Sequence, residues 1–149
     1  MTDQILNDDY FMRAALAEAR KAFEADEVPV GAVVVCDNRI IARSHNTTEK
    51  LNDVTAHAEM LAITSASNHL GGKYLKDCTL FVTLEPCAMC AGALFWTQVD
   101  KLVYGADDPK RGFLSHGPQL LHPKTKVTKG VLAEESTAML KEFFSKKRG

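Results

Sequence analysis

The chain is 149 residues long, carries a formal net charge of −1, and is 46% hydrophobic and 25% charged. This length allows one domain with a real core, and the composition excludes a disordered or fibrous protein. No apolar run approaches the roughly 18 residues of a membrane span, and the acidic N-terminus lacks the basic region of a signal peptide. We therefore expect a single domain over residues 1–149, in the cytoplasm and without a membrane segment.

Helices and strands are expected to alternate along the chain. A helix is predicted at 9–25, and two strands at 32–36 and 39–42 flank the hairpin turn Asp37-Asn38. After a loop at 45–53, Thr55 is expected to cap the next helix. The later elements are a helix at 56–68, a strand at 79–83, a helix at 87–97, a strand at 102–105, a long loop at 106–125, a strand at 127–132 and a helix at 134–147. This order is typical of a three-layer α/β/α sandwich.

Two short strings carry the chemistry: HAE at 57–59 and PCAMC at 86–90. One imidazole and two thiolates, from His57, Cys87 and Cys90, are three good zinc ligands. They leave a fourth tetrahedral position for water, as in a catalytic zinc site. Both cysteines are expected in the first turn of a helix, where the helix dipole favours the thiolate. Glu59, beside the histidine, could move protons for that water.

Other interpretations of these residues remain open. A CxxC pair alone also suits a redox site, and a zinc-stabilised binding module would need the metal but not Glu59. Cys36 and Cys78 are expected to be small core residues and Trp96 is expected in the core. Glu85 is interpreted as a structural carboxylate, and His45 as a surface or core residue.

Longer stretches support a family resemblance. They are EVPVGAV at 27–33, His45-Asn46, TAHAE at 55–59, TLEPCAMCAGA at 83–93, VYGA at 103–106 and the terminal Phe143-Phe144. With these the chain resembles the cytidine deaminase superfamily and, within it, the bacterial tRNA-specific adenosine deaminases, whose zinc signature is a known pattern. The resemblance implies a five-stranded mixed sheet flanked by helices, a homodimer and one zinc ion per chain. It also implies conversion of adenosine to inosine at the wobble position of a tRNA anticodon.

The resemblance also implies roles for single residues. His57, Cys87 and Cys90 match the zinc ligands, Glu59 matches the proton shuttle, and Asn46 matches an asparagine that contacts the base. Asp108 and Lys110 match positions at which members of the family lie close to RNA.

The chain departs from the family pattern at Val54, in the string GADDPKRGFL at 105–114, and at Phe95-Trp96, which looks somewhat like the related guanine deaminases. A guanine or other free-base or nucleoside deaminase is therefore the alternative. The charge pattern bears on this choice, because residues 101–149 hold ten Lys or Arg against five Asp or Glu. If RNA is the substrate, basic residues are expected at the pocket mouth, where they would bind phosphates. They are Lys110, Arg111, Lys146, Lys147 and Arg148.

Overall fold

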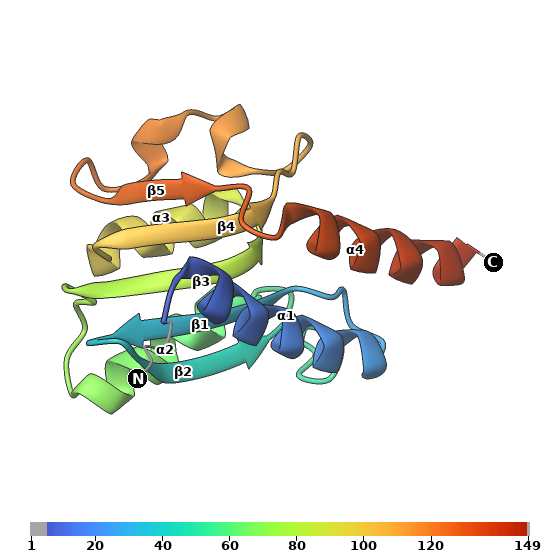
Figure 1. Ribbon diagram of the computed structural model, residues 1–149, viewed down its shortest axis with the longest axis horizontal. Coiled ribbons are helices and arrows are strands. Elements are labelled where there is room, and N and C mark those ends of the chain that lie inside the picture. Colours follow the sequence, from blue (N-terminus) through green and yellow to red (C-terminus); the bar gives the residue numbers. More distant parts are fainter. Residues whose placement is uncertain (1–5, 149) are drawn as a thin grey trace.

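A five-stranded mixed sheet, in the order β2-β1-β3-β4-β5, runs through the protein (Figure 1). The computed structural model describes residues 6–148. β1 pairs antiparallel with β2 and β3, whereas β4 pairs parallel with β3 and β5. The elements are α1 (Asp8–Glu24), β1 (Gly31–Cys36), β2 (Arg39–His45), α2 (Ala58–Leu70), β3 (Cys78–Leu84), α3 (Ala88–Thr97), β4 (Lys101–Ala106), β5 (Lys126–Lys129) and α4 (Ala133–Arg148).

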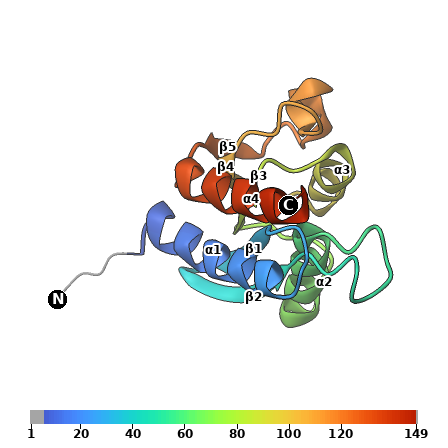
Figure 2. The ribbon, with the colours of Figure 1, turned by 90° about the vertical axis from the view of Figure 1, so that its right-hand side faces the viewer.

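Helices cover both faces of this sheet, because side chains of a strand alternate between its faces. In β1, Val33 and Val35 point to the face that packs with Phe11 and Met12 of α1. Ala32 and Val34, with the opposite orientation, join a larger cluster that includes residues of α2 and α3. Figure 2 shows α1 and α4 on one side of the strands and α2 and α3 on the other. The predicted three-layer α/β/α sandwich is thereby confirmed.

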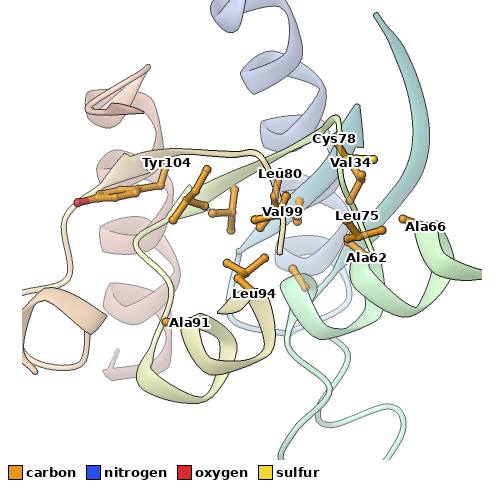
Figure 3. Close-up of a cluster of buried hydrophobic side chains, with 14 of the residues drawn as sticks. Val34, Ala62, Ala66, Leu75, Cys78, Leu80, Ala91, Leu94, Val99 and Tyr104 are labelled. Carbon is orange, nitrogen blue, oxygen red and sulfur yellow. The ribbon is translucent and has the colours of Figure 1, made fainter. Parts of the chain in front are cut away.

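The larger cluster fixes α2 and α3 against the sheet (Figure 3). Ala62 and Ala66 of α2 and Leu94 of α3 are fully buried against Leu80 and neighbouring strand residues. Small residues on α2 let the helix lie close to the strands. Because both helices are held along their length, the positions of their N-terminal ends are fixed as well, and both of those ends carry predicted zinc ligands.

Several details differ from the sequence predictions. The cap of α2 is His57 rather than Thr55, whose hydroxyl instead donates to Asp53 at 2.7 Å. The last strand ends at Lys129, because Gly130 turns the chain with a φ of 84°. Trp96 is 75% exposed, so its predicted place in the core is wrong.

The predicted hairpin turn has the left-handed φ values of 56° and 60° that a type I′ turn requires. Cys78 is buried as expected, and Cys36, its partner in the register of β1 and β3, is half-buried. No helix within residues 6–148 combines the length and the apolar character needed to cross a membrane.

Candidate active site

Three predicted zinc ligands meet where α2 and α3 begin. His57 directly precedes α2, Cys87 directly precedes α3, and Cys90 lies in the first turn of α3. The ligand atoms of all three lie within 4.8 Å of one another. His57 Nδ1 is 3.7 Å from the Cys87 sulfur and 3.5 Å from the Cys90 sulfur. Zinc bonds of about 2.3 Å to sulfur and about 2.0–2.1 Å to nitrogen, at a tetrahedral angle, separate such atoms by about 3.6 Å. The three side chains therefore fit a zinc ion.

Local hydrogen bonds fix the orientation of the histidine. The His57 N–H donates to the carbonyl of Thr55 at 2.7 Å. The next N–H, that of Ala58, donates to Oδ1 of Asn46 at 2.8 Å. Asn46 therefore satisfies one of the free N–H groups at the start of α2, which no side chain of the helix satisfies. The same bond turns the amide nitrogen of Asn46 away from the helix.

The two thiol groups differ in how readily they ionise. A hydrogen bond from the Cys90 thiol, assisted by one from His57, lowers the pKa of Cys87 to about 3. The same contact, together with burial, raises the pKa of Cys90. The hydrogen bond to Cys87 also raises the pKa of His57. The cluster thus holds an anionic sulfur at neutral pH, and it attracts a cation that accepts nitrogen and sulfur ligands.

Glu59 lies in the first turn of α2 beside these ligands and is only 4% exposed. Burial raises its pKa to about 7. A carboxyl group with this pKa takes up and releases a proton near neutral pH, which is the property that a general acid–base needs. The carboxyl group is buried yet lines a cavity, so it is placed to exchange a proton with a molecule bound there.

The cavity has a volume of about 660 Å³ and lies over the zinc ligands. This volume is in the range of small-molecule sites and suits a nucleoside-sized group. Of the predicted site residues, Cys90 is buried in the adjoining cluster, and the others line the cavity: Asn46, His57, Glu59, Cys87, Asp108 and Lys110. Arg111, expected at its mouth, lines it too. The cavity is also lined by residues that were not predicted from the sequence: Val28, Val30, Thr48, Leu84, Glu85, Asp107, Leu140 and Phe144.

Most of these additional residues gave no local signal. Val28 and Val30 flank Pro29, which ends the first helical pattern, and Leu140 and Phe144 have only the apolar spacing of the last helix. Phe144 also belongs to the family resemblance. The positions of Leu140 and Phe144 in the cavity depend on how α4 packs against β3 and β4, which are distant from it in the sequence.

A second groove, of about 550 Å³, continues from this cavity along α4. The two share Asp107, Leu140 and Phe144, and Lys141 and Arg148 line the continuation. The expectation that Lys146 and Lys147 lie at the pocket mouth is wrong. Both face the end of α1, where Lys147 forms an ion pair with Asp26 at 2.7 Å. His45 hydrogen-bonds Glu18 at 3.3 Å and does not line the cavity.

Comparison with known proteins shows to which family a chain with this site belongs. The cytidine and deoxycytidylate deaminase zinc-binding region matches residues 6–106. A tRNA-specific adenosine deaminase of Agrobacterium fabrum is 48% identical over 144 residues, covering 93% of this chain and 95% of its own. A solved structure from work on A-to-I editing by tRNA:A34 deaminases is 47% identical with a TM-score of 0.83, covering 88% of this chain and 99% of its own.

The structure of a guanine deaminase from Nitrosomonas europaea has nearly the same fold, with a TM-score of 0.82 and coverage of 96% of this chain and 87% of its own. Its sequence identity, however, is only 25%. Fold likeness alone does not separate the two groups, and a guanine deaminase structure from Bacillus subtilis reaches 40% identity, with a TM-score of 0.65, although it covers only 68% of this chain and 65% of its own. The tRNA-specific adenosine deaminases combine 45–48% identity with coverage of more than nine-tenths of this chain. The chain therefore belongs to the zinc-binding cytidine and deoxycytidylate deaminase family, on the branch of the tRNA-specific adenosine deaminases.

Proposed function

We propose that this protein is a zinc-dependent hydrolase that converts adenosine to inosine at the wobble position of a tRNA anticodon. The observation that carries the proposal is the buried Glu59 carboxyl, in one cavity with His57 and Cys87 and beside Cys90. A structural zinc site needs no such acid. We infer the substrate from the tRNA-specific relatives, which are 45–48% identical over more than nine-tenths of the chain.

The reaction needs a proton carrier, and Glu59 supplies it. When bound, zinc acts as a Lewis acid that lowers the pKa of a water molecule toward about 7. Glu59 takes the proton of that water while the oxygen attacks the carbon bearing the exocyclic amine. It delivers this proton to the adjacent ring nitrogen, and then moves the remaining proton of the added hydroxyl group to the amine. The C–N bond breaks as the C=O bond forms, and the amine leaves as ammonia. Inosine remains in the cavity.

The cavity walls suit a purine. Val28, Val30 and Leu84 offer apolar surface to the base, while Asn46 keeps its amide nitrogen free to donate to it, since its oxygen is bound by Ala58. A base that is paired and stacked inside a duplex could not enter this cavity. A nucleotide of a single-stranded loop can flip in at the least unstacking cost.

Basic residues at the rim favour a polynucleotide over a free base. Lys110 and Arg111 are exposed and line the cavity, and Lys141 and Arg148 line the groove that continues from it. A free base carries no phosphate for these cations. We assign Asp108 and Lys110 to substrate binding, with the Asp108 carboxylate also shaping the rim by accepting the N–H groups of Lys110 and Arg111 at 3.2 and 3.1 Å.

The test compares two substrates and two double variants. Bulk tRNA and free guanine are incubated with the purified protein, and inosine and ammonia are measured. Lys110→Ala/Arg111→Ala should reduce the slope of log K for tRNA binding against log salt concentration by about 1.4, because each of the two lost phosphate contacts removes about 0.7 on single strands. Lys73→Ala/Lys76→Ala, exposed and outside the cavity, is the control. Unchanged salt dependence together with rapid guanine turnover would favour the guanine deaminase.

We also propose a homodimer of one-domain subunits over residues 1–149, working in the cytoplasm where its tRNA substrate is. In support of the dimer, α3 leaves Met89 and Trp96 exposed, and Leu114 is exposed in a nearby turn. Light scattering at micromolar concentration should give twice the chain mass. A mass near 16.4 kDa would refute the dimer.

A further inference from the structure

Two loops contribute to the walls of the cavity, and one buried glutamate accepts backbone N–H groups from each of them. Residues 46–53 contribute Asn46 and Thr48 to the lining, and residues 107–111 contribute four lining residues. No residue from 47 to 55, and none from 107 to 111, is buried. The first stretch therefore has no buried apolar side chain of its own, whereas the second is followed by Phe113, which is buried in the core and donates its N–H to the Pro86 carbonyl at 2.8 Å.

Glu27 holds the first wall. It follows the end of α1, to which its own N–H is bonded through the carbonyl of Ala22 at 2.8 Å, and it is 1% exposed. One carboxylate oxygen accepts the N–H of Glu49 at 3.0 Å, and the other accepts the N–H of Lys50 at 2.9 Å. The hydroxyl of Thr48, a lining residue, is 3.4 Å from the first oxygen.

Backbone hydrogen bonds also hold the base of this loop, from the Asn46 N–H to the Val30 carbonyl at 3.1 Å and from the Thr47 N–H to the Ala56 carbonyl at 3.0 Å, while bonds farther along fold the loop upon itself. Examples are Asp53 N–H to the Thr48 carbonyl at 3.0 Å and Leu51 N–H to the Thr47 carbonyl at 3.0 Å. The bonds at the base place Asn46 and Thr47, and the internal bonds preserve the shape of the loop, but neither set ties Glu49 or Lys50 to the core. The Glu27 carboxylate supplies that contact for the outer part of the loop.

Glu85 holds the second wall in the same way. It is 6% exposed at the end of β3, and its two oxygens accept the N–H groups of Asp108 and Leu114 at 2.9 and 3.0 Å. These donors bracket Lys110 and Arg111. The backbone of Gly112 lies so close to the carboxylate that a methyl group on Gly112 would overlap it.

We propose that Glu27 and Glu85 are positioning residues that set the two substrate-facing walls, each through a two-oxygen clamp on backbone N–H groups. A buried N–H that loses its acceptor carries a desolvation cost, so the closed position of the wall is disfavoured when the clamp is broken. His57 and Cys87 directly precede α2 and α3, Glu59 and Cys90 lie in the first turns of these helices, and none of the four donates a hydrogen bond to Glu27 or Glu85. Loosening a wall therefore weakens substrate binding more than it slows the chemical step.

The variants that test this are Glu27→Gln and Glu85→Gln, with Glu24→Gln, exposed on α1, as the matched control. Glutamine has the same length but replaces one acceptor oxygen with an NH₂ group that faces a backbone donor. The first measurement is native-state amide exchange. Glu49 and Lys50 amides should exchange about tenfold faster in Glu27→Gln only, and Asp108 and Leu114 amides in Glu85→Gln only, about 1.4 kcal/mol in each case.

The second measurement is steady-state kinetics with a tRNA anticodon stem-loop. Each glutamine variant should raise KM about tenfold, equivalent to about 1.4 kcal/mol, with full zinc content and kcat within about threefold of the parent. The shorter Glu27→Asp and Glu85→Asp, which keep both oxygens, should recover part of the loss. Gly112→Ala, which displaces the Glu85 carboxylate from the other side, should reproduce the Glu85→Gln phenotype.

This proposal rests on the proposed function only for the choice of substrate, because the kinetic measurement uses tRNA. If the parent protein deaminated no tRNA, the proposed function would fail, while amide exchange would still decide whether the carboxylates hold the walls. Unchanged exchange at the four clamped amides would overturn the proposal. So would an unchanged KM, or a kcat loss that accompanies loss of zinc, because either would make the residues structural or metal-supporting.

Discussion

Replacement of Glu59 by glutamine separates proton transfer from every other task of the site. The side chain is 4% exposed, so solvent cannot take its place, and glutamine fills the same volume without disturbing α2. The amide cannot carry a proton between water and base. General acid–base catalysis contributes about 10²–10⁴-fold, so kcat should fall by that factor, which corresponds to about 3–5 kcal/mol of barrier.

The assay measures single-turnover inosine formation in tRNA by enzyme purified without added metal, alongside elemental analysis. Zinc should remain near one equivalent, and KM should change little, because His57, Cys87 and Cys90 are untouched. Glu142→Gln, on the exposed surface of α4, is the control. Retention of more than a tenth of parent activity with zinc bound would show that Glu59 is not the proton carrier.

Three further substitutions test the site and the packing. Cys90→Ala should lose zinc as well as activity, since two ligands do not hold the ion; retention of a full equivalent by elemental analysis would contradict the ligand set. Gly31→Ala should destabilise by about 1–3 kcal/mol in urea unfolding, because its methyl would overlap the backbone of α1, whereas Gly72→Ala, with open space around it, should stay within about 0.5 kcal/mol. Tyr104→Phe removes a buried hydroxyl with no hydrogen-bond partner among the described residues, so its Tm should rise by about 2–4 °C; a lower Tm would indicate a partner such as a bound water.

The zinc cluster was predictable because its geometry is local. A cysteine pair three residues apart at a helix start shares a face, and a histidine at a second helix start needs only that both helix ends meet. The alternation of strands and helices already indicates that they do, since helices that follow strands begin at one edge of the sheet. The prediction of Thr55 as the cap failed for a local reason as well: Asp53 competes for its hydroxyl.

The cavity walls were less predictable because they depend on pairs distant in sequence. The Glu27 carboxylate accepts hydrogen bonds from residues that lie 22 and 23 positions later in the chain. The Glu85 carboxylate accepts them from residues that lie 23 and 29 positions later. No periodicity links such partners. Lys147 was misplaced for the same reason, because an ion pair with Asp26 turns it away from the cavity, and this pair spans 121 positions.

The two kinds of contact also differ in how they tolerate sequence change. The zinc ligands act through side-chain atoms, so any substitution among them removes a bond to the metal. The wall clamps bind backbone N–H groups, which every residue except proline provides. Residues 49, 50 and 108–114 can therefore change their side chains while the walls keep their positions. The loop at 105–114 departs from the family pattern, yet it remains seated on Glu85. Substrate preference can thus be retuned at the rim without moving the zinc ligands or Glu59.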